Sequence, residues 1–360
     1  MEFPNLIKTT KGEVHEHDHR RYRLAKNVFA MHGVDDNGKA VLVKPKLARE
    51  HLLSLIAPLP PCVIGMEACT GAHPWARQFR RHDHSVRLMA PKFVSPSRMS
   101  GKRGQHDAAD AAAICEAVTR PHMRHVPVKE EHPQIILTLH RARQGFVEER
   151  TALYNRLRGL IAEFGIVLPQ KVSCLCREIG YPLEDLPGYA HLCVRDLIGH
   201  ADRLDTLIAE YDRLIAQTAR ENAHSKRLMP LPGIGPTTAS ARLASLGGAH
   251  EFDNGRPVAA WIGLVLGQYS SGGKARLGRI TRAGDSYLRS LLVMGARDLL
   301  SGLGDQQDRF SRWARNLVER RGDWRAVVAI AAKKARPAWA VLKYGEDSKR
   351  STNPILARIF

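Results

Sequence analysis

The sequence predicts an α/β domain followed by long helices and a mostly helical C-terminal region. Three observations support this prediction. Between residues 24 and 130, short apolar runs alternate with helical stretches, which is the pattern of a sheet covered by helices. Between residues 131 and 226, apolar residues recur every seven positions. After residue 227, helical stretches are separated by turns rich in glycine and proline.

The composition favours a polyanionic partner. The chain has 360 residues, with 55 Lys and Arg against 36 Asp and Glu, so its formal charge is +19. Such an excess is most often found in proteins that bind nucleic acid. No apolar run approaches the roughly 20 residues that a transmembrane helix needs. We therefore expect a nucleic-acid partner and no membrane.

Residues 1–23 do not fit the patterns that follow. They hold a cluster of His and Asp between His15 and His19, and then three arginines around Tyr22. We interpret this segment as an atypical, disordered tail. A metal-binding tract is the alternative.

The elements of the predicted α/β domain begin with a hairpin, because the turn Asp35-Asp36-Asn37-Gly38 separates two apolar runs. Strands are expected at residues 27–34, 39–43, 62–66, 85–89 and 122–128, and helices at residues 47–56, 75–81 and 107–118.

Three carboxylates in this domain are candidate metal ligands. Glu67 lies at the carboxyl end of a predicted strand. Asp107 and Asp110 are three residues apart, so they share one face of a helix. Carboxylates gathered in this way suit Mg²⁺ ions that activate a phosphodiester. The alternatives are ordinary ones, a helix N-terminal acid for Asp107 and a solvated strand end for Glu67.

Two long helices are predicted next, at about residues 133–164 and 195–221. In the first, Leu139, Phe146, Leu153 and Leu160 recur every seven residues, and Arg143 and Arg150 interrupt the pattern. Heptads of this kind predict a coiled coil or helical hairpin. Two interpretations stay open, a dimerisation arm and a plain antiparallel helix pair within one chain.

A Pro232-Gly233-Ile234-Gly235 turn lies between two predicted helices, and Thr237 could cap the second. This is the pattern of a helix-hairpin-helix, whose backbone N–H groups hold phosphate without reading base sequence. The alternative is a tight interhelical turn. The C-terminal helix that follows carries Trp324 and Trp339, which we expect to be core residues.

Residues 268–280 combine two serines, three glycines and several cations. Ser270 and Ser271 precede Gly272 and Gly273, and Lys274, Arg276 and Arg279 follow. Glycines allow close approach of a ligand to the backbone, cations neutralise phosphate, and an activated serine can attack phosphorus. A basic surface loop with ordinary serines is the alternative.

These motifs, in this order, resemble one family. It is the DEDD-type insertion-sequence transposases of the IS-one-ten group, which also contains the Piv DNA invertases. The resemblance spans nearly everything after residue 23. The matching motifs are Leu24-Ala25-Lys26-Asn27-Val28-Phe29, Gly65-Met66-Glu67-Ala68, Asp107-Ala108-Ala109-Asp110-Ala111, Pro232-Gly233-Ile234-Gly235-Pro236, Ser270-Ser271-Gly272-Gly273-Lys274 and Arg282-Ala283-Gly284-Asp285-Ser286-Tyr287-Leu288-Arg289.

The resemblance implies an RNase H-like (RuvC-like) DEDD domain at residues 24–130, a coiled-coil region at 131–226, a C-terminal transposase domain with a helix-hairpin-helix at 227–346, and a tail at 347–360. It also implies a bacterial, cytoplasmic, nucleoid-associated enzyme, a homodimer or homotetramer, that cuts and rejoins the DNA of an insertion sequence. Some members are directed by a structured RNA encoded in the element.

The resemblance further implies roles for individual residues. Glu67, Asp107 and Asp110 would hold Mg²⁺. Ser271 would be the nucleophile, with Ser270 as the alternative. DNA would be bound by Gly233, Gly235 and Thr237 of the turn and by Lys274, Arg276 and Arg279.

One departure from the family pattern affects the metal site. The family's first aspartate belongs directly before Leu24, where this chain has Arg23, and a cation there would repel Mg²⁺. One permitted back-translation of residues 17–23, shifted by one base, reads Met-Thr-Thr-Val-Gly-Ile-Asp. We therefore hypothesise that residues 1–23 are out of frame and that this copy is inactive. The alternatives are a catalytically dead protein that still binds DNA or RNA, and a RuvC-like nuclease that does not use Ser271.

Overall fold

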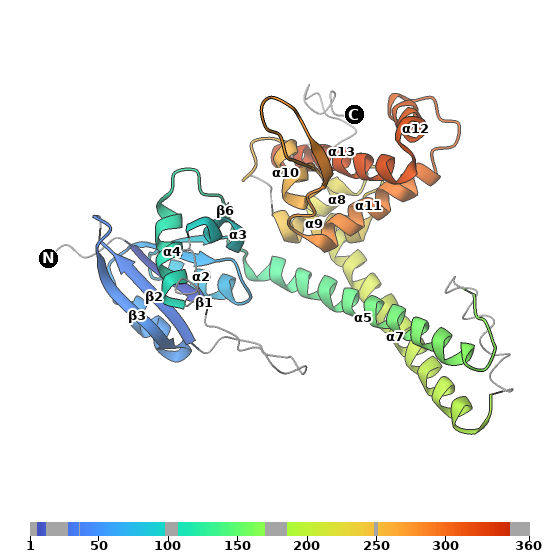
Figure 1. Ribbon diagram of the computed structural model, residues 1–360, viewed down its shortest axis with the longest axis horizontal. Coiled ribbons are helices and arrows are strands. Elements are labelled where there is room, and N and C mark those ends of the chain that lie inside the picture. Colours follow the sequence, from blue (N-terminus) through green and yellow to red (C-terminus); the bar gives the residue numbers. More distant parts are fainter. Residues whose placement is uncertain are drawn as a thin grey trace. The chain divides into compact units, whose positions relative to one another are not determined.

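The structure is a computed structural model of the chain, drawn in Figure 1. It describes residues 6–11, 28–35, 37–97, 107–169, 186–247 and 251–345; for residues 6–11, 107 and 108 it describes the backbone only. The chain divides into two compact units, Met1–Glu130 and Glu131–Phe360. The second unit holds both the long helices and the C-terminal helices.

The first unit is built on a six-stranded sheet with the strand order β3-β2-β1-β4-β5-β6. Strands β1, β2 and β3 are antiparallel neighbours, β4 runs parallel to both β1 and β5, and β6 is antiparallel to β5. The strands are β1 (Leu6–Lys11), β2 (Val28–Val34), β3 (Ala40–Ala48), β4 (Val63–Glu67), β5 (Ser85–Met89) and β6 (His125–Val126).

The central strand β1 comes from the segment that was predicted to be a disordered tail. It pairs with β2 on one side and with β4 on the other, and Thr9 lies opposite Met66. The Leu-Ile-Lys-Thr-Thr run has β-branched residues that favour a strand, a signal that the His and Arg clusters after it masked. Thus part of residues 1–23 belongs to the sheet.

The edge strand β3 is longer than the sequence predicted. Leu47 and Ala48 were expected to begin a helix, but they continue β3, and the helix α1 (Leu52–Ile56) starts later, after a short 3₁₀ turn. Proline interrupts central strands because it lacks an N–H donor, but edge strands and bulges tolerate it. Pro45 lies at an edge and within a register shift opposite β2, so it does not end the strand.

Helices cover both faces of this sheet. On one face, α1 and α2 (Ala72–Arg80) pack on Ile64 and Leu88 through Leu52 and Phe79. The other face is covered by α4 (Asp107–Thr119). The short helix α3 (Pro91–Val94) shares a hydrophobic core with α4. Side chains alternate between the two faces of a strand, so Val63, Gly65 and Glu67 face α4.

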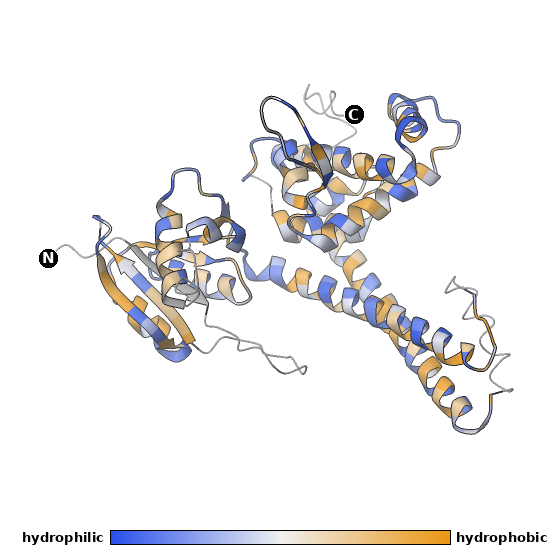
Figure 2. Ribbon diagram, viewed as in Figure 1, coloured by the Kyte–Doolittle hydropathy of each residue, from blue (hydrophilic) through white to orange (hydrophobic). Residues whose placement is uncertain are grey.

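The second unit begins with two antiparallel helices, α5 (Glu131–Ala162) and α7 (Gly188–Glu221). Hydrophobic and hydrophilic residues alternate along both (Figure 2). The shared core contains Leu153, Leu157 and Leu204. Leu160 of the predicted heptad is 42% exposed, and its neighbour Ile161 is buried in its place, because straight helices drift from a seven-residue repeat.

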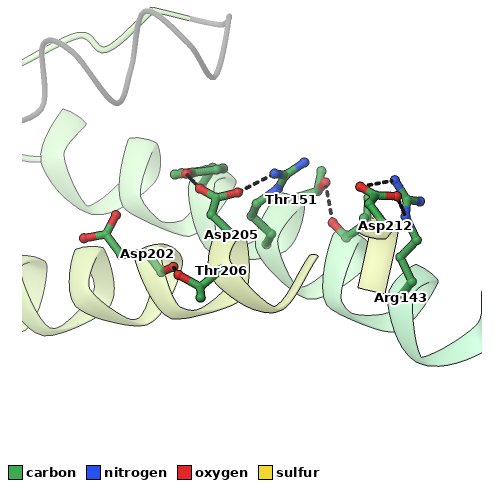
Figure 3. Close-up of polar contacts among 9 residues, drawn as sticks. Arg143, Thr151, Asp202, Asp205, Thr206 and Asp212 are labelled. Atoms are coloured by element: carbon green, nitrogen blue, oxygen red, sulfur yellow. Dashed lines mark hydrogen bonds and ion pairs between the residues drawn. The ribbon is translucent and has the colours of Figure 1, made fainter. Parts of the chain in front are cut away.

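The two arginines that interrupt the heptads are paired across the helices. Arg143 binds both carboxylate oxygens of Asp212, with 3.1 Å between Nη2 and Oδ2, and Arg150 forms an ion pair with Asp205 (Figure 3). Tyr154 also donates to Asp205, at 3.0 Å. The pairs are seven residues apart on each helix, so they hold one antiparallel register within the chain.

The C-terminal helices pack around the last one, α13 (Asp323–Tyr344), which is buried along most of its length. Trp339 is buried there, as predicted, but Trp324 is 71% exposed, contrary to its predicted place in the core. The other elements are α8 (Ala223–Leu228), α9 (Pro236–Leu246), α10 (Gly255–Ile262), the strands β7 (Leu266–Gln268) and β8 (Leu277–Ile280), α11 (Ser286–Ser301) and α12 (Arg309–Arg321).

A buried histidine joins the long helices to the C-terminal helices. His140 of α5 is fully buried; its Nδ1 lies 3.0 Å from the Tyr287 hydroxyl of α11, and its Nε2 lies 3.1 Å from the Ser240 hydroxyl of α9. Burial, reinforced by the charge of Arg143, lowers the pKa of His140 to about 4, although Asp285 opposes the shift. The ring is therefore neutral at physiological pH.

Because His140 is buried in its neutral form, we predict that acid lowers the stability of the helical unit. Between about pH 6.5 and 4 the unfolded chain takes up a proton at His140 that the folded chain does not, so the free energy of unfolding falls as the pH falls through this range. The expected loss is roughly 3 kcal/mol at most. Urea denaturation followed by circular dichroism measures it. His140→Gln should remove most of this loss, and the exposed His224→Gln should leave it unchanged; equal pH dependence in both variants would contradict the assignment.

Candidate functional site

Two of the three candidate metal ligands face the same layer of the first unit. Glu67 ends β4, and its side chain is only 8% exposed. Ile114 and Val118 of α4 pack against Gly65 so closely that a Cβ there would lie 3.1 Å from Val118. Asp110 lies one turn before Ile114, on the same helix face. Glu67 and Asp110 therefore both project into the layer between β4 and α4.

The kind of donor in this layer suits a hard divalent cation, since carboxylate oxygens are the ligands that Mg²⁺ prefers. The side chain of Asp107 lies outside the described residues. Among the side chains that the structure describes, no group of three or more His, Cys, Asp or Glu is arranged to hold a metal. The three-acid set thus stays a prediction.

The strand beside Glu67 supplies no acid. Because Thr9 pairs with Met66 in the parallel register, the next residue, Thr10, is level with Glu67. The β1 sequence is Leu-Ile-Lys-Thr-Thr-Lys. Arg23, which takes the place of the family's first aspartate in the sequence, lies outside the described residues. The central strand is present, and its sequence contains no Asp or Glu.

Residues 266–280 form a β-hairpin whose tip is Ser271-Gly272-Gly273-Lys274. Gly272 and Gly273 have φ angles of 55° and 75°, and the Lys274 N–H donates to Ser271 O at 3.1 Å. Two residues with positive φ are what a type I′ turn requires. The glycine pair is thus explained by the turn rather than by close approach of a ligand.

The two serines differ in what their hydroxyls do. The Ser270 hydroxyl accepts from Gln268 Nε2 at 2.7 Å and from the Arg276 N–H at 3.2 Å, so it holds the hairpin together. Ser271 is exposed at the tip, and its hydroxyl has no hydrogen bond to any residue that the structure describes. Ser271 is therefore the serine that is available for chemistry.

The cations of the hairpin all follow this serine in the sequence, and all are exposed. Lys274 lies in the turn, Arg276 follows it, and Arg279 lies in β8. No carboxylate within the described ranges forms an ion pair with them. The hairpin therefore presents uncompensated positive charge beside the Ser271 hydroxyl.

The base of the hairpin is held by the Arg282–Arg289 motif, whose role was not foreseen from the sequence. Asp285 caps α11 by accepting from the Leu288 N–H and also accepts from the Ser245 hydroxyl, both at 3.0 Å. Arg289 donates to the carbonyls of Ile262 and Ala283. Gly284 lies so close to α10 that a Cβ would be 1.9 Å from the Trp261 oxygen. These contacts position the hairpin on the helices.

The predicted helix-hairpin-helix turn lies between α8 and α9, but its details differ from the prediction. Gly235, not Thr237, is the N-cap of α9, and no side chain caps this end. Pro236 occupies the first helical turn, so Thr237 comes too late in the helix to cap it. Gly233 is packed on α11, since its Cβ would lie 2.6 Å from the Gly295 oxygen, whereas Gly235 is exposed.

Alanine at these two glycine positions should affect stability to very different degrees. Gly233→Ala should lower the free energy of unfolding by about 2–5 kcal/mol, because φ is 72° and the new methyl group meets Gly295. The matched variant Gly235→Ala should change it by no more than about 1 kcal/mol, since nothing lies within 4 Å. Chemical denaturation checks both, and a Gly233→Ala protein as stable as wild type would refute the packing role.

The comparisons with known proteins agree on one family. Residues 24–166 match a DEDD transposase family, and residues 225–310 match the transposase IS116/IS110/IS902 family. A Pseudomonas aeruginosa protein described as a probable family 20 transposase is 43% identical over 324 residues, which is 89% of this chain and 95% of the relative. The transposase for the Yersinia enterocolitica insertion sequence element IS1328 is 36% identical over 323 residues, covering 89% and 96%.

The chain therefore belongs to the IS116/IS110/IS902 family of insertion-sequence transposases. It is a transposase in class, so it is an enzyme that acts on DNA. The DEDD transposase domain implies an RNase H-like fold, and the β3-β2-β1-β4-β5 order of the first unit is consistent with it. No helix in the described ranges is both long and apolar enough to cross a bilayer.

Proposed function

We propose that this protein cuts and rejoins DNA through a covalent link to Ser271. The observation that carries the proposal is the exposed Ser271 hydroxyl at the tip of a basic hairpin. Attack by this hydroxyl on a phosphodiester releases one sugar hydroxyl and leaves the strand joined to the serine. Attack of a second sugar hydroxyl on that link reverses it, so rejoining needs no ATP. Serine is a weak nucleophile at neutral pH and needs activation.

The activating site in this proposal is the carboxylate layer of the first unit. Glu67, Asp110 and Asp107 would hold Mg²⁺, and the buried position of Glu67 and the orientation of Asp110 support this. A bound Mg²⁺ would lower the pKa of the attacking hydroxyl and neutralise charge on the phosphate. The acids and Ser271 belong to different units, so the reaction requires the units to meet within one chain or between chains.

DNA contacts in this proposal come from exposed groups of the second unit. Lys274, Arg276 and Arg279 would neutralise phosphates beside Ser271. The helix-hairpin-helix would use the N–H groups at Gly235 and Thr237, with Gly233 acting through packing. The α5–α7 pair would serve as a coiled-coil arm that joins chains into a homodimer or homotetramer. A guide RNA would direct the enzyme to its DNA. The reaction would take place at the nucleoid.

We further propose that this copy is catalytically impaired, because β1 carries no acid beside Glu67. A frameshift is one origin and divergence of the first strand is another. A match to the Sinorhizobium fredii protein y4pF/y4sB covers 97% of the chain, leaving out about 11 of its 360 residues, so it reaches into residues 1–23. The family match begins at residue 24, and the coding DNA distinguishes the two origins. A shifted frame that reads as an apolar strand ending in Asp would establish the frameshift.

Replacing residues 1–23 with Met-Thr-Thr-Val-Gly-Ile-Asp should restore activity, because it returns a carboxylate to the strand beside Glu67. The measurement is formation of protein–DNA adducts that resist detergent, with Mg²⁺, the element ends and any flanking RNA. Adducts only in the repaired chain support the proposal. Adducts in both chains would show that the first acid is dispensable, and adducts in neither would favour the binding-only alternative.

In whichever chain forms adducts, Ser271→Ala should reduce them by at least about 1,000-fold, because the attacking oxygen is removed. The matched control is Ser270→Ala, which removes a hydroxyl one residue away that only stabilises the hairpin; a decrease within about tenfold is expected. Loss of adducts in Ser270→Ala but not in Ser271→Ala would reassign the nucleophile. If neither the original nor the repaired chain forms adducts but DNA is still cleaved, and cleavage survives Ser271→Ala, the nuclease alternative is established.

A further inference from the structure

A pair of lysines on α13 lies against two aromatic rings of α12, far along the chain from the Ser271 hairpin. Lys334 is only 8% exposed, and Lys333 is half-buried. Buried ammonium groups are rare unless a carboxylate or another anion compensates them. Among the described residues, no carboxylate forms an ion pair with either lysine.

The aromatic rings fix where the ammonium groups lie. Lys333 Nζ is 4.1 Å from the Trp313 ring centre and 5.6 Å from the Phe310 ring centre, and Lys334 Nζ is 4.5 Å from the Phe310 ring centre. The two rings are 5.7 Å apart. Aromatic faces attract cations but carry no net charge, so they orient the two lysines without neutralising them.

The charges around this pair are mostly of the same sign. Burial, together with the charges of Arg309 and Arg336, lowers the pKa of Lys333; burial and the charge of Lys333 lower the pKa of Lys334 to about 8. Asp308 is the acid that opposes this effect at Lys334. Its carboxylate already caps α12 by accepting from the N–H groups of Phe310 and Ser311 and from the Ser311 hydroxyl. The cluster therefore has an excess of positive charge.

We propose that Lys333 and Lys334 bind a phosphodiester group of nucleic acid between α12 and α13, at a site separate from the Ser271 hairpin. An anion placed there supplies the missing charge for both ammonium groups and for Arg309 and Arg336. A phosphodiester fits because it is a compact anion with two free oxygens, one for each lysine. The inference rests on the proposed function only in taking nucleic acid as the substrate.

The test is fluorescence anisotropy with the full chain and two probes, a short labelled DNA duplex and a labelled RNA of the same sequence. Lys333→Gln combined with Lys334→Met removes both charges and keeps a flexible apolar stem on Phe310. Lys226→Gln is the matched control, because it removes an exposed lysine of the same unit. Lys333→Gln alone keeps the test valid if the double variant folds poorly, and melting temperatures are recorded for all.

The double variant should weaken binding about tenfold or more, and the slope of log Kd against log salt should fall by about 1, because one phosphate is no longer neutralised. Lys226→Gln should change Kd less than about threefold. The melting temperature of the double variant should not fall below that of the Lys333→Gln protein, because Lys334→Met removes a buried charge. Weaker binding of DNA alone, RNA alone or both identifies which strand occupies the site.

Unchanged Kd and unchanged salt slope in folded variants would overturn the inference, as would a wild-type chain that binds neither probe. Ser271→Ala should bind both probes like wild type. Absence of adducts in the repaired chain, with binding intact, would therefore refute the serine chemistry and leave this site standing. If adducts form normally in the repaired chain, and the Lys333 and Lys334 variants bind both probes as tightly as wild type, this phosphate site is refuted and the serine chemistry stands.

Discussion

The first unit depends on the pairing of β1 between β2 and β4. Without a strand in that position, the backbone N–H and C=O groups along one edge of β2 and one edge of β4 would lack partners in the middle of the sheet. Filling this gap requires an extended backbone and makes few demands on side chains. Leu6–Lys11 meets that requirement although it has no acid. In the proposed function this strand would carry the first metal ligand, and the fold forms without that carboxylate.

The second unit depends on close approach between backbones. Gly233 and Gly295 meet so closely that a Cβ on Gly295 would lie 2.1 Å from the Gly233 oxygen, and Gly263 and Gly284 are equally crowded by their neighbours. Gly233 belongs to the Pro232-Gly233-Ile234-Gly235 turn, and Gly284 belongs to the Arg282–Arg289 motif. In the structure they allow neighbouring backbones to approach closely, whereas Gly235, two residues after Gly233, is exposed. One turn thus holds a glycine that packing requires and a glycine that stays accessible.

The arginines at heptad positions of α5 show how charge can define helix register. Arg143 and Arg150 would disrupt a purely apolar seam, but each meets an aspartate of α7 at the same spacing (Figure 3). A slip of the helices by one turn would leave these half-buried charges unpaired, which is more costly than a slip of leucine against leucine. The buried His140, bonded to α9 and α11, then ties this arm to the C-terminal helices.

The sequence by itself determined the elements with strong local patterns and the family. Strands β2, β4 and β5, the helix at Asp107, both long helices and the motif order all follow from periodicity and from residue types that act locally. Tertiary structure decided what depends on distant partners: the use of Leu6–Lys11 as the central strand, the extension of β3 past Pro45, the exposure of Trp324 and the different roles of Ser270 and Ser271. A strand needs neighbouring strands to pair its backbone N–H and C=O groups, and the exposure of a side chain depends on what packs on it from elsewhere in the chain. Local sequence pattern alone therefore determines neither strand pairing nor side-chain exposure.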